Sequence, residues 1–239
     1  MRNVKLYNND CYKVLDDLAN ENVKVDLVLT DQPYYIDTTN AKKKKVSSRI
    51  DKNIGLSSEQ LQFVSNGFDY KTIYQKIEKI QDNINIIMFC CNDQVGELQT
   101  FFTSKGLNVD ILIWNKYNAI PIANGHIIND AEYIIVAREK GATFNNDAPL
   151  DCKRRVFTEP LVSNKFHPCE KPISILNKLV ILYSKQNSTI LDPFMGSGTT
   201  GISSVKNDRD FIGIELIDKY FDIARARIDN ENRQMKMFN

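Results

Sequence analysis

Short apolar runs recur along the chain, separated by segments with hydrophobic residues at helical spacing. Seven runs predict β-strands, at residues 4–7, 26–30, 84–90, 109–114, 133–137, 189–191 and 211–215. The run at 26–30 is mainly apolar, as expected of a strand that helices cover on both faces. Strands that alternate with helices predict an α/β fold with a mostly parallel sheet and helices on both of its faces.

Apolar residues three and four positions apart predict the helices. The residues that mark them are Val14, Leu15 and Leu18; Ile73, Ile77 and Ile80; Leu98, Phe101 and Phe102, with Gly106 as a stop; Ile173, Leu176, Leu179, Val180 and Tyr183, begun by Pro172; and Tyr220, Phe221, Ala224 and Ile228. A further short pattern begins at Ser57 and ends near Gly67. Residues 230–239 are expected to fray, as chain ends often do.

Length and composition favour one cytoplasmic domain over residues 1–239. The chain has 239 residues, of which 42% are hydrophobic, and this suffices to bury a single core. Its five cysteines are odd in number and lack C-x-x-C spacing, which fits a reducing compartment and no structural zinc. No run approaches the ~20 apolar residues of a membrane helix, and the N-terminus lacks a secretion signal, so no membrane partner is expected.

Basic residues gather in two clusters, although the net charge is only +1. The first cluster is Lys42, Lys43, Lys44 and Lys45 with Arg49, and the second is Lys153, Arg154 and Arg155. The first lies in a polar segment at 36–56 without periodicity, which is expected to form a mobile loop. Each cluster alone fits a solvated loop as well as it fits a phosphate-binding surface.

A glycine-rich turn follows the strand at 189–191. Asp192 ends this strand, the segment G-S-G-T-T-G at 196–201 follows, and a helix is expected from Thr199. Glycines let a ligand approach the backbone, and the N–H groups of a helix start can bind it. Glu215 ends the next strand, where a carboxylate can accept hydrogen bonds from both ribose hydroxyls. The unit predicts an adenosine-containing cofactor, although a glycine pattern alone is as often a turn without a ligand.

Several motifs together resemble amino-directed DNA methyltransferases. Asp31-Gln32-Pro33-Tyr34 resembles their D-P-P-Y signature, and D-P-F-M-G-S-G-T-T at 192–200 resembles their S-adenosylmethionine loop. The segment H-P-C-E-K-P at 167–172 is similar to their H-P-x-x-K-P motif, and the segments at 114–121, 132–133 and 211–226 also resemble the family. The order of motifs is that of the β group, which implies a Rossmann-like, circularly permuted methyltransferase fold with a seven-stranded sheet.

The resemblance implies a set of cofactor-binding residues. They are Asp10, Asp192, Pro193, Phe194, Gly196, Ser197, Gly198, Thr199, Thr200, Glu215, His167 and Lys171. Asp10 would bind the adenine amino group of the cofactor, or it would cap the following helix. Lys171 would approach the cofactor carboxylate. The family also places target recognition in a segment that corresponds to 140–166, and its short length predicts weak discrimination or a short target sequence.

The catalytic residues implied by the resemblance are Asp31, Gln32, Pro33 and Tyr34. Asp31 and the main-chain carbonyl of Gln32 would accept hydrogen bonds from an exocyclic base amine, which attacks the sulfonium methyl directly. Tyr34 would stack on the base after it leaves the duplex. Gln32 departs from the family pattern, which has proline there. The carbonyl remains, and Pro33 still favours an extended conformation at position 32, so retained activity is expected.

The leading hypothesis is transfer of a methyl group from S-adenosylmethionine to the N6 amine of adenine in double-stranded DNA. An acid at position 31 favours adenine, because N4-cytosine enzymes more often begin this motif with serine. A cytosine-N4 enzyme and a catalytically weak cofactor-binding subunit remain alternatives. A nicotinamide-dependent oxidoreductase would leave the motif at 31–34 unexplained. The resemblance also leaves open a homodimer and a restriction endonuclease partner in the same system.

Overall fold

The computed structural model describes residues 1–32, 69–119, 127–162, 166 and 170–237. Its strands are β1 (Val4–Asn8), β2 (Leu27–Asp31), β3 (Asn85–Cys90), β4 (Asn108–Asn115), β5 (Ala131–Arg138), β6 (Val156–Thr158), β7 (Thr189–Asp192) and β8 (Asp210–Glu215). Its α-helices are α1 (Cys11–Asn20), α4 (Tyr70–Ile80), α5 (Asn92–Ser104), α6 (Ile173–Tyr183), α7 (Thr199–Lys206) and α8 (Asp218–Met237), and η2 (Leu150–Lys153) is a 3₁₀ helix. The segments at 36–56 and 57–67 lie outside the described residues.

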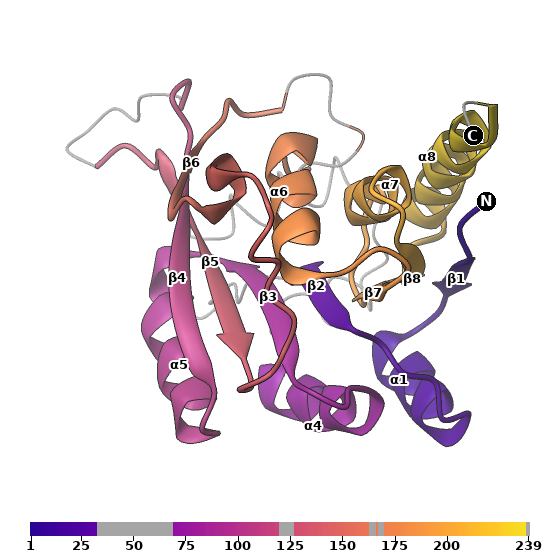
Figure 1. Cartoon of the computed structure of the whole chain (residues 1–239), viewed down its shortest axis with the longest axis horizontal. Coiled ribbons are helices and arrows are strands. Elements are labelled where there is room, and N and C mark those ends of the chain that lie inside the picture. The colour runs from indigo at the N-terminus through magenta and orange to yellow at the C-terminus, as the bar shows by residue number, and fades with distance from the viewer. Residues whose placement is uncertain (33–68, 120–126, 163–165, 167–169, 238–239) are drawn as a thin grey trace, which may run out of the picture.

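The strands form one eight-stranded sheet in the order β1-β8-β7-β2-β3-β5-β4-β6 (Figure 1). Strands β1, β8, β7, β2 and β3 are parallel, and β5 is antiparallel to both β3 and β4. The α/β class, the mostly parallel sheet and the seven predicted strands are therefore confirmed.

The predicted count of seven strands was one too few. The additional strand, β6, pairs in parallel with the end of β4. It has only three residues, and of these only Phe157 is buried, while Val156 and Thr158 are exposed. Such a short segment shows no hydrophobic period, and its pairing with a distant strand creates it.

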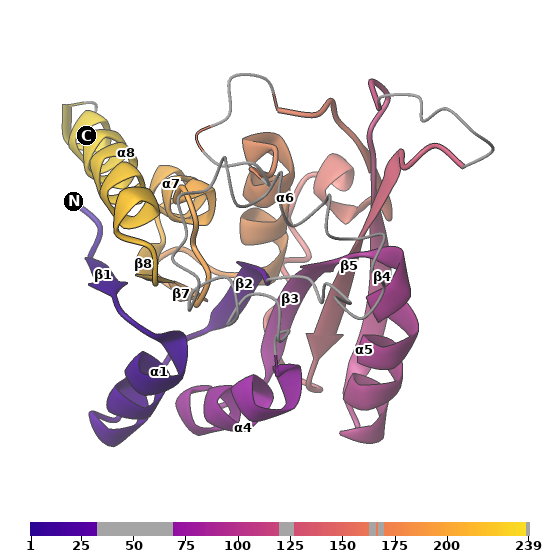
Figure 2. The ribbon, with the colours of Figure 1, turned by 180° about the vertical axis from the view of Figure 1, so that it is seen from behind.

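Helices cover both faces of the sheet (Figure 1 and Figure 2). The alternation along β2 shows how: Leu27 and Leu29 belong to the core beneath α6, α7 and α8, whereas Val28 belongs to the core beneath α1, α4 and α5. The apolar positions that predicted α1 and α4 are all buried, and Cys11 and Tyr74 are buried with them. No helix in the described ranges is both long and apolar enough to cross a membrane.

The direction of winding reverses between β2 and β7. From β2 the chain continues through α4 to β3 on one side, and from β7 it continues through α7 to β8 on the other side. The backbones of β2 and β7 pair directly, with Leu27 opposite Ile190 and Val28 opposite Leu191. This is a topological switch point, where ligands bind at the carboxyl ends of strands.

The C-terminal helix corrects one prediction. Residues 230–237 are not frayed, because α8 extends to Met237. Asn232 is buried, and its side chain accepts a hydrogen bond from the backbone N–H of Arg2 (3.0 Å) and donates one to the Arg2 carbonyl (3.1 Å). This contact joins the two ends of the chain, and local sequence could not reveal it.

Candidate active site

Four acidic residues stand in a row at the carboxyl edge of the sheet. Glu215 ends β8, Asp192 ends β7, Asp31 ends β2, and Asp10 follows β1 by two residues. These four strands are parallel neighbours in the order β1-β8-β7-β2. The fold thus gathers acids that are far apart in the sequence along one edge of the sheet, and Asp192 and Asp31 flank the switch point.

The glycine-rich turn joins Asp192 to α7. Gly196 and Gly198 have positive φ angles of 51° and 83°, a region that side chains disfavour. A Cβ atom on Gly198 would also lie 2.9 Å from the Cβ of Ala224 in α8. Gly198 is therefore required by the turn and by helix packing, and both requirements shape the surface that a cofactor would meet.

The Glu215 carboxylate is held by backbone N–H groups and can accept a hydrogen bond from a ribose hydroxyl. Its Oε2 accepts the backbone N–H of Gly196 (3.0 Å), and its Oε1 accepts that of Ile217 (2.9 Å). Burial raises the pKa of the Glu215 carboxyl, and these backbone donors oppose the rise. The backbone N–H of Leu216 also bonds to this carboxyl. An ionised carboxylate has about four acceptor sites, so a site remains for a ribose hydroxyl.

Asp192 links the cofactor strand to its neighbours. Its buried Oδ1 accepts hydrogen bonds from the Thr30 hydroxyl (2.8 Å) and the Phe194 backbone N–H (3.1 Å), and the Thr200 side chain also bonds to this carboxyl. Burial raises the pKa of Asp192 to about 7, although these hydrogen bonds oppose the rise. Asp192 thus fixes the glycine-rich turn against β2, while its direct contact with the cofactor stays a prediction.

Asp10 caps α1. Its Oδ1 accepts the backbone N–H of Tyr12 at 2.7 Å, so the role of helix cap, one of the two predicted for Asp10, is confirmed. Asn8, at the end of β1, lies opposite Glu215. Burial raises the pKa of the Cys11 thiol to about 12, with further contributions from the carboxylates of Asp10 and Glu215. Asp10 and Glu215 therefore border the same region, and a role for Asp10 at the adenine of the cofactor stays a prediction.

Lys171 pairs with the predicted catalytic acid. Its Nζ lies 2.7 Å from Asp31 Oδ2 and 2.7 Å from Glu132 Oε1, and Glu132 Oε2 lies 3.0 Å from Lys116 Nζ. Burial lowers the pKa of Lys171, but the two carboxylates more than compensate and the net shift is upward. Lys171 was predicted to approach the cofactor carboxylate, and that contact stays a prediction.

Glu132 and Lys116 were not among the predicted site residues. Both lie in the middle segments that resemble the methyltransferase family, and this resemblance was the signal that could have found them. Their meeting with Lys171 depends on the order of strands β2, β3, β5 and β4, which the sequence does not give directly.

Gln32 is almost fully buried, with 2% of its surface exposed. Within the part of the chain that the structure describes, neither Nε2 nor Oε1 of its side chain has a hydrogen-bond partner. A buried polar group without a partner costs about 1–3 kcal/mol. The other predicted residues of this segment, Pro33 and Tyr34, lie outside the described residues, as does His167.

The second basic cluster is exposed and engaged with its own chain. Arg155 lies 3.0 Å from the Asp110 carboxylate and donates to the carbonyl of Ile111 at 2.9 Å. Arg154 lies 3.6 Å from Asp151, and Lys153 donates to the carbonyl of Asn146. Contact of these residues with DNA stays a prediction. The first cluster, Lys42, Lys43, Lys44, Lys45 and Arg49, lies outside the described residues.

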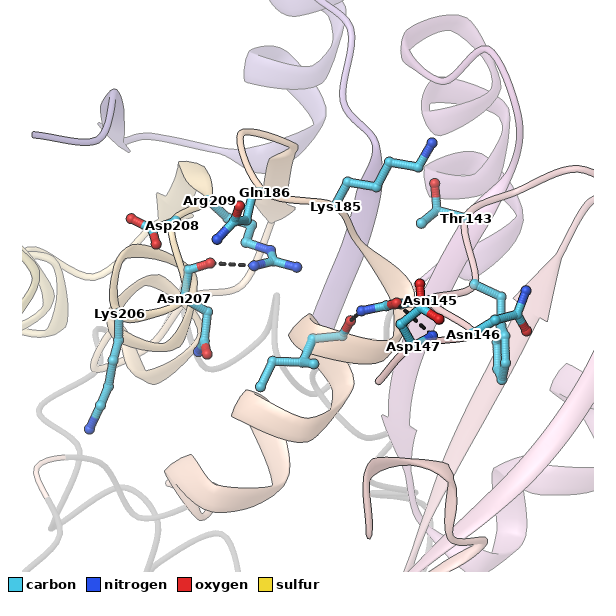
Figure 3. A pocket seen from close by; sticks show the side chains of 12 residues that line it. Thr143, Asn145, Asn146, Asp147, Lys185, Gln186, Lys206, Asn207, Asp208 and Arg209 are labelled. Atoms are coloured by element: carbon cyan, nitrogen blue, oxygen red, sulfur yellow. Dashed lines mark hydrogen bonds between the residues drawn. The ribbon is translucent and has the colours of Figure 1, made fainter. Parts of the chain in front are cut away.

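A polar cavity of about 860 Å³ lies at the opposite edge of the sheet (Figure 3). Its lining includes Gln186 and Asp208, which lie in the segments that lead into β7 and β8, so it borders the amino ends of these strands. Arg209 in its wall donates to the Ser184 hydroxyl at 2.9 Å and to the Ser184 carbonyl at 2.6 Å. The cavity is remote from the row of acids and is not the active site.

Comparisons with known proteins agree with this geometry. A profile of the DNA methylase family matches residues 25–226. The type II methyltransferase M2.MboI of Moraxella bovis is 23% identical over 242 residues, which cover 95% of this chain and 88% of that protein.

Solved structures are also similar. The M1.HpyAVI–SAM complex has a TM-score of 0.70 and 25% identity, and the alignment covers 94% of this chain and 99% of that one. The cytosine-N4-specific PvuII DNA methyltransferase has a TM-score of 0.67 at 11% identity, covering 98% and 92%, and shares the fold.

The residues at the carboxyl edge fit S-adenosylmethionine, because the Glu215 carboxylate can accept a ribose hydroxyl beside the turn around Gly198. In the described ranges no group of three or more His, Cys, Asp or Glu residues could hold a metal ion. The profile covers well over half of the chain, so the protein belongs to the N6/N4 DNA methylase family and is a DNA methyltransferase that uses S-adenosylmethionine.

Proposed function

We propose that this enzyme methylates the N6 amine of adenine in double-stranded DNA. The observation that carries the proposal is the position of Asp31, a carboxylate at the end of β2 whose neighbour β7 leads into the glycine-rich turn. A carboxylate there can accept a hydrogen bond from a base amine while the methyl donor lies in the adjacent turn. An acid at this position, in place of serine, favours adenine over cytosine.

The chemistry needs positioning more than a strong base. The lone pair of an exocyclic amine is conjugated into the ring, which makes the nitrogen a poor nucleophile. Hydrogen bonds from the amine to Asp31 and to the carbonyl of Gln32 favour a tetrahedral nitrogen, whose lone pair then faces the electrophilic methyl group that S-adenosylmethionine supplies. In-line placement of this kind can lower a barrier by as much as ~7–11 kcal/mol. Extrusion of the base from the duplex costs roughly a few kcal/mol.

In the proposed function, residues at the carboxyl edge of the sheet hold the cofactor. Glu215 binds the ribose, Asp10 borders the adenine, and the turn around Gly196 and Gly198 receives the methionine part. Contacts of the two basic clusters with DNA phosphates, a homodimer, a restriction endonuclease partner and a cytoplasmic location remain predictions that accompany this function.

Two alternatives have specific observations in their favour. The similarity in fold to the cytosine-N4-specific PvuII enzyme supports N4 methylation of cytosine, since a cytosine amine could use the same acceptors. The buried side chain of Gln32, with no partner in the described part of the chain, supports a cofactor-binding subunit with weak catalysis.

The test is to express the protein in a host that lacks DNA methylation and to quantify modified nucleosides in digested DNA by mass spectrometry. The Asp31→Ala variant is the control. N6-methyladenine in the wild type alone supports the proposal. N4-methylcytosine would keep the mechanism and change the base, while the absence of any modified base, together with binding of S-adenosylmethionine, would identify a binding subunit.

A further inference from the structure

Four charged side chains of alternating sign cross the carboxyl edge of the sheet. They run from Asp31 through Lys171 and Glu132 to Lys116, with nitrogen–oxygen distances of 2.7, 2.7 and 3.0 Å. Asp31 ends β2, Glu132 lies near the start of the antiparallel strand β5, and Lys116 directly follows β4. Since the sheet order is β2-β3-β5-β4, this charge chain spans four adjacent strands.

The charge chain is largely removed from solvent. The side chain of Lys171 is 7% exposed, and those of Lys116, Glu132 and Asp31 are 10%, 12% and 22% exposed. The Lys171 ammonium lies 5.3 Å from the ring centroid of Phe89 in β3, and Lys116 lies 5.0 Å from that of Trp114. Burying an ion is unfavourable, and pairing with an opposite charge offsets this cost. The formal charges of these four side chains sum to zero.

Stability alone does not explain such an arrangement, because a buried ion pair is often no more stable than apolar residues of the same size. Lys76 offers a comparison. It also pairs with an aspartate, Asp16, at 2.6 Å, but that carboxylate is 50% exposed and lies on α1, away from the row of acids. Only Lys171, of these two lysines, contacts a residue that the proposed reaction uses.

We propose that Lys171 is a positioning residue for Asp31, and that Glu132 and Lys116 hold Lys171 in place. This inference rests on the proposed function. Fixing Oδ2 of Asp31 on the ammonium sets the direction of the second carboxylate oxygen. The positive charge also favours the ionised carboxylate, which accepts a hydrogen bond from an amine and cannot donate one.

Glu132 performs a second task in this arrangement. It draws the ammonium toward β5 while Asp31 draws it toward β2, so Lys171 is held between two anchors instead of following Asp31 alone. Lys116 neutralises the second oxygen of Glu132. A lysine held in this way is less suited to bind the carboxylate of the cofactor, and the two roles predict different kinetics.

The experiment compares Lys171→Met with Lys171→Arg and with the control Lys76→Met. Single-turnover methyl transfer at saturating DNA and cofactor is measured across pH, and the Kd for S-adenosylmethionine is measured by calorimetry. We expect Lys171→Met to slow transfer on the order of 10²-fold, as small misplacements of catalytic groups do. We expect its Kd to stay within about twofold, the acid limb of its pH profile to move to higher pH, and Lys171→Arg to recover part of the rate. Lys76→Met should match the wild type.

Loss of the lysine leaves two carboxylates facing each other, so folding is controlled with the double variant Lys171→Met/Glu132→Gln and thermal unfolding. We expect this double variant to fold and still to transfer slowly. A rate near that of the wild type in either variant, or an unmoved pH profile, would overturn the inference. A weakened Kd with normal transfer at saturation would make Lys171 a cofactor ligand instead. A wild type that transfers no methyl group would refute the proposed function itself.

Discussion

The Thr30 hydroxyl donates a hydrogen bond to the carboxylate of Asp192 across the switch point, at 2.8 Å. Thr30 directly precedes the proposed catalytic acid, and Asp192 directly precedes the glycine-rich turn. Both side chains are buried, with 1% and 2% of their surface exposed. The strand that ends in the proposed base acceptor and the strand that leads into the proposed cofactor turn are therefore held together by side chains as well as by their backbones.

Burial of Asp192 predicts a dependence of stability on pH. Its pKa rises from the ordinary 3.8 to about 7 in the folded chain, so between these values the folded state holds a proton that the unfolded state has lost. The free energy of unfolding should then fall as pH rises from about 4 to about 7, by an amount on the order of 4 kcal/mol, and level off above pH 7.

The Asp192→Asn variant removes this titration. The amide changes the hydrogen bonds with Thr30 and Thr200 by an amount that does not vary with pH, whereas the difference in stability from the wild type should move in favour of the variant between about pH 4 and pH 7. Urea unfolding at several pH values, without cofactor, measures the difference. Parallel pH profiles for the two proteins would show that Asp192 is already ionised at low pH.

Two glycines should respond in opposite ways to alanine. Gly198→Ala adds a Cβ at φ 83°, 2.9 Å from the Cβ of Ala224, and should destabilise the protein by about 2–5 kcal/mol and weaken binding of S-adenosylmethionine. Gly96 lies in α5, and a Cβ there meets nothing within 4 Å. Gly96→Ala should therefore stabilise the protein by about 0.4–1 kcal/mol. Thermal unfolding of both variants tests this, and equal effects would contradict it.

Glu215→Gln should weaken cofactor binding without preventing folding. The amide keeps one oxygen for a backbone N–H, but its NH₂ group cannot accept the second N–H or a ribose hydroxyl. Hydrogen bonds to charged groups are worth about 1.5–3 kcal/mol, so the Kd for S-adenosylmethionine should rise on the order of 10- to 100-fold. Calorimetric titration measures it. Glu97→Gln on α5, where the carboxylate accepts only an exposed Tyr70 hydroxyl among the bonds described, is the matched control.

Much of the fold was predictable because its signals are local. A few neighbouring residues suffice to recognise the apolar run before Asp31, the turn around Gly198 and the acid at Glu215. Parallel strands then bring their carboxyl ends to one edge of the sheet. Strand β6, which was not predicted, and the contact of Arg2 with Asn232 both depend on partners that are remote in sequence, so local patterns could not reveal them.

In the site, too, single residues were predictable and their contacts were not. The sequence supplied Asp31 and Lys171 separately, yet it did not show that their side chains meet, nor that Glu132 and Lys116 join them. Those contacts arise from the order β2-β3-β5-β4, in which an antiparallel strand brings its amino end to the carboxyl edge. A side-chain network across neighbouring strands follows from topology, which local patterns encode only indirectly.

Substitutions of Gln32 test whether methyl transfer tolerates a residue other than proline at this position of the D-P-P-Y pattern. The proposed reaction uses the main-chain carbonyl at this position, and proline and glutamine both provide it. Gln32→Pro also removes a buried amide that lacks partners within the described ranges, a group whose burial costs about 1–3 kcal/mol. We therefore expect the wild type to be active and Gln32→Pro to transfer methyl groups at a similar or moderately higher rate, within about tenfold.

Single-turnover transfer to unmethylated DNA measures this effect, and Gln32→Leu separates the two causes, because leucine removes the amide without constraining the backbone. If leucine and proline raise the rate equally, the buried amide of Gln32 slows methyl transfer in the wild type. If only proline raises the rate, the backbone conformation at position 32 is the cause. A wild type without detectable turnover that Gln32→Pro restores would show that glutamine disables catalysis, and the natural chain would then act as a cofactor-binding subunit.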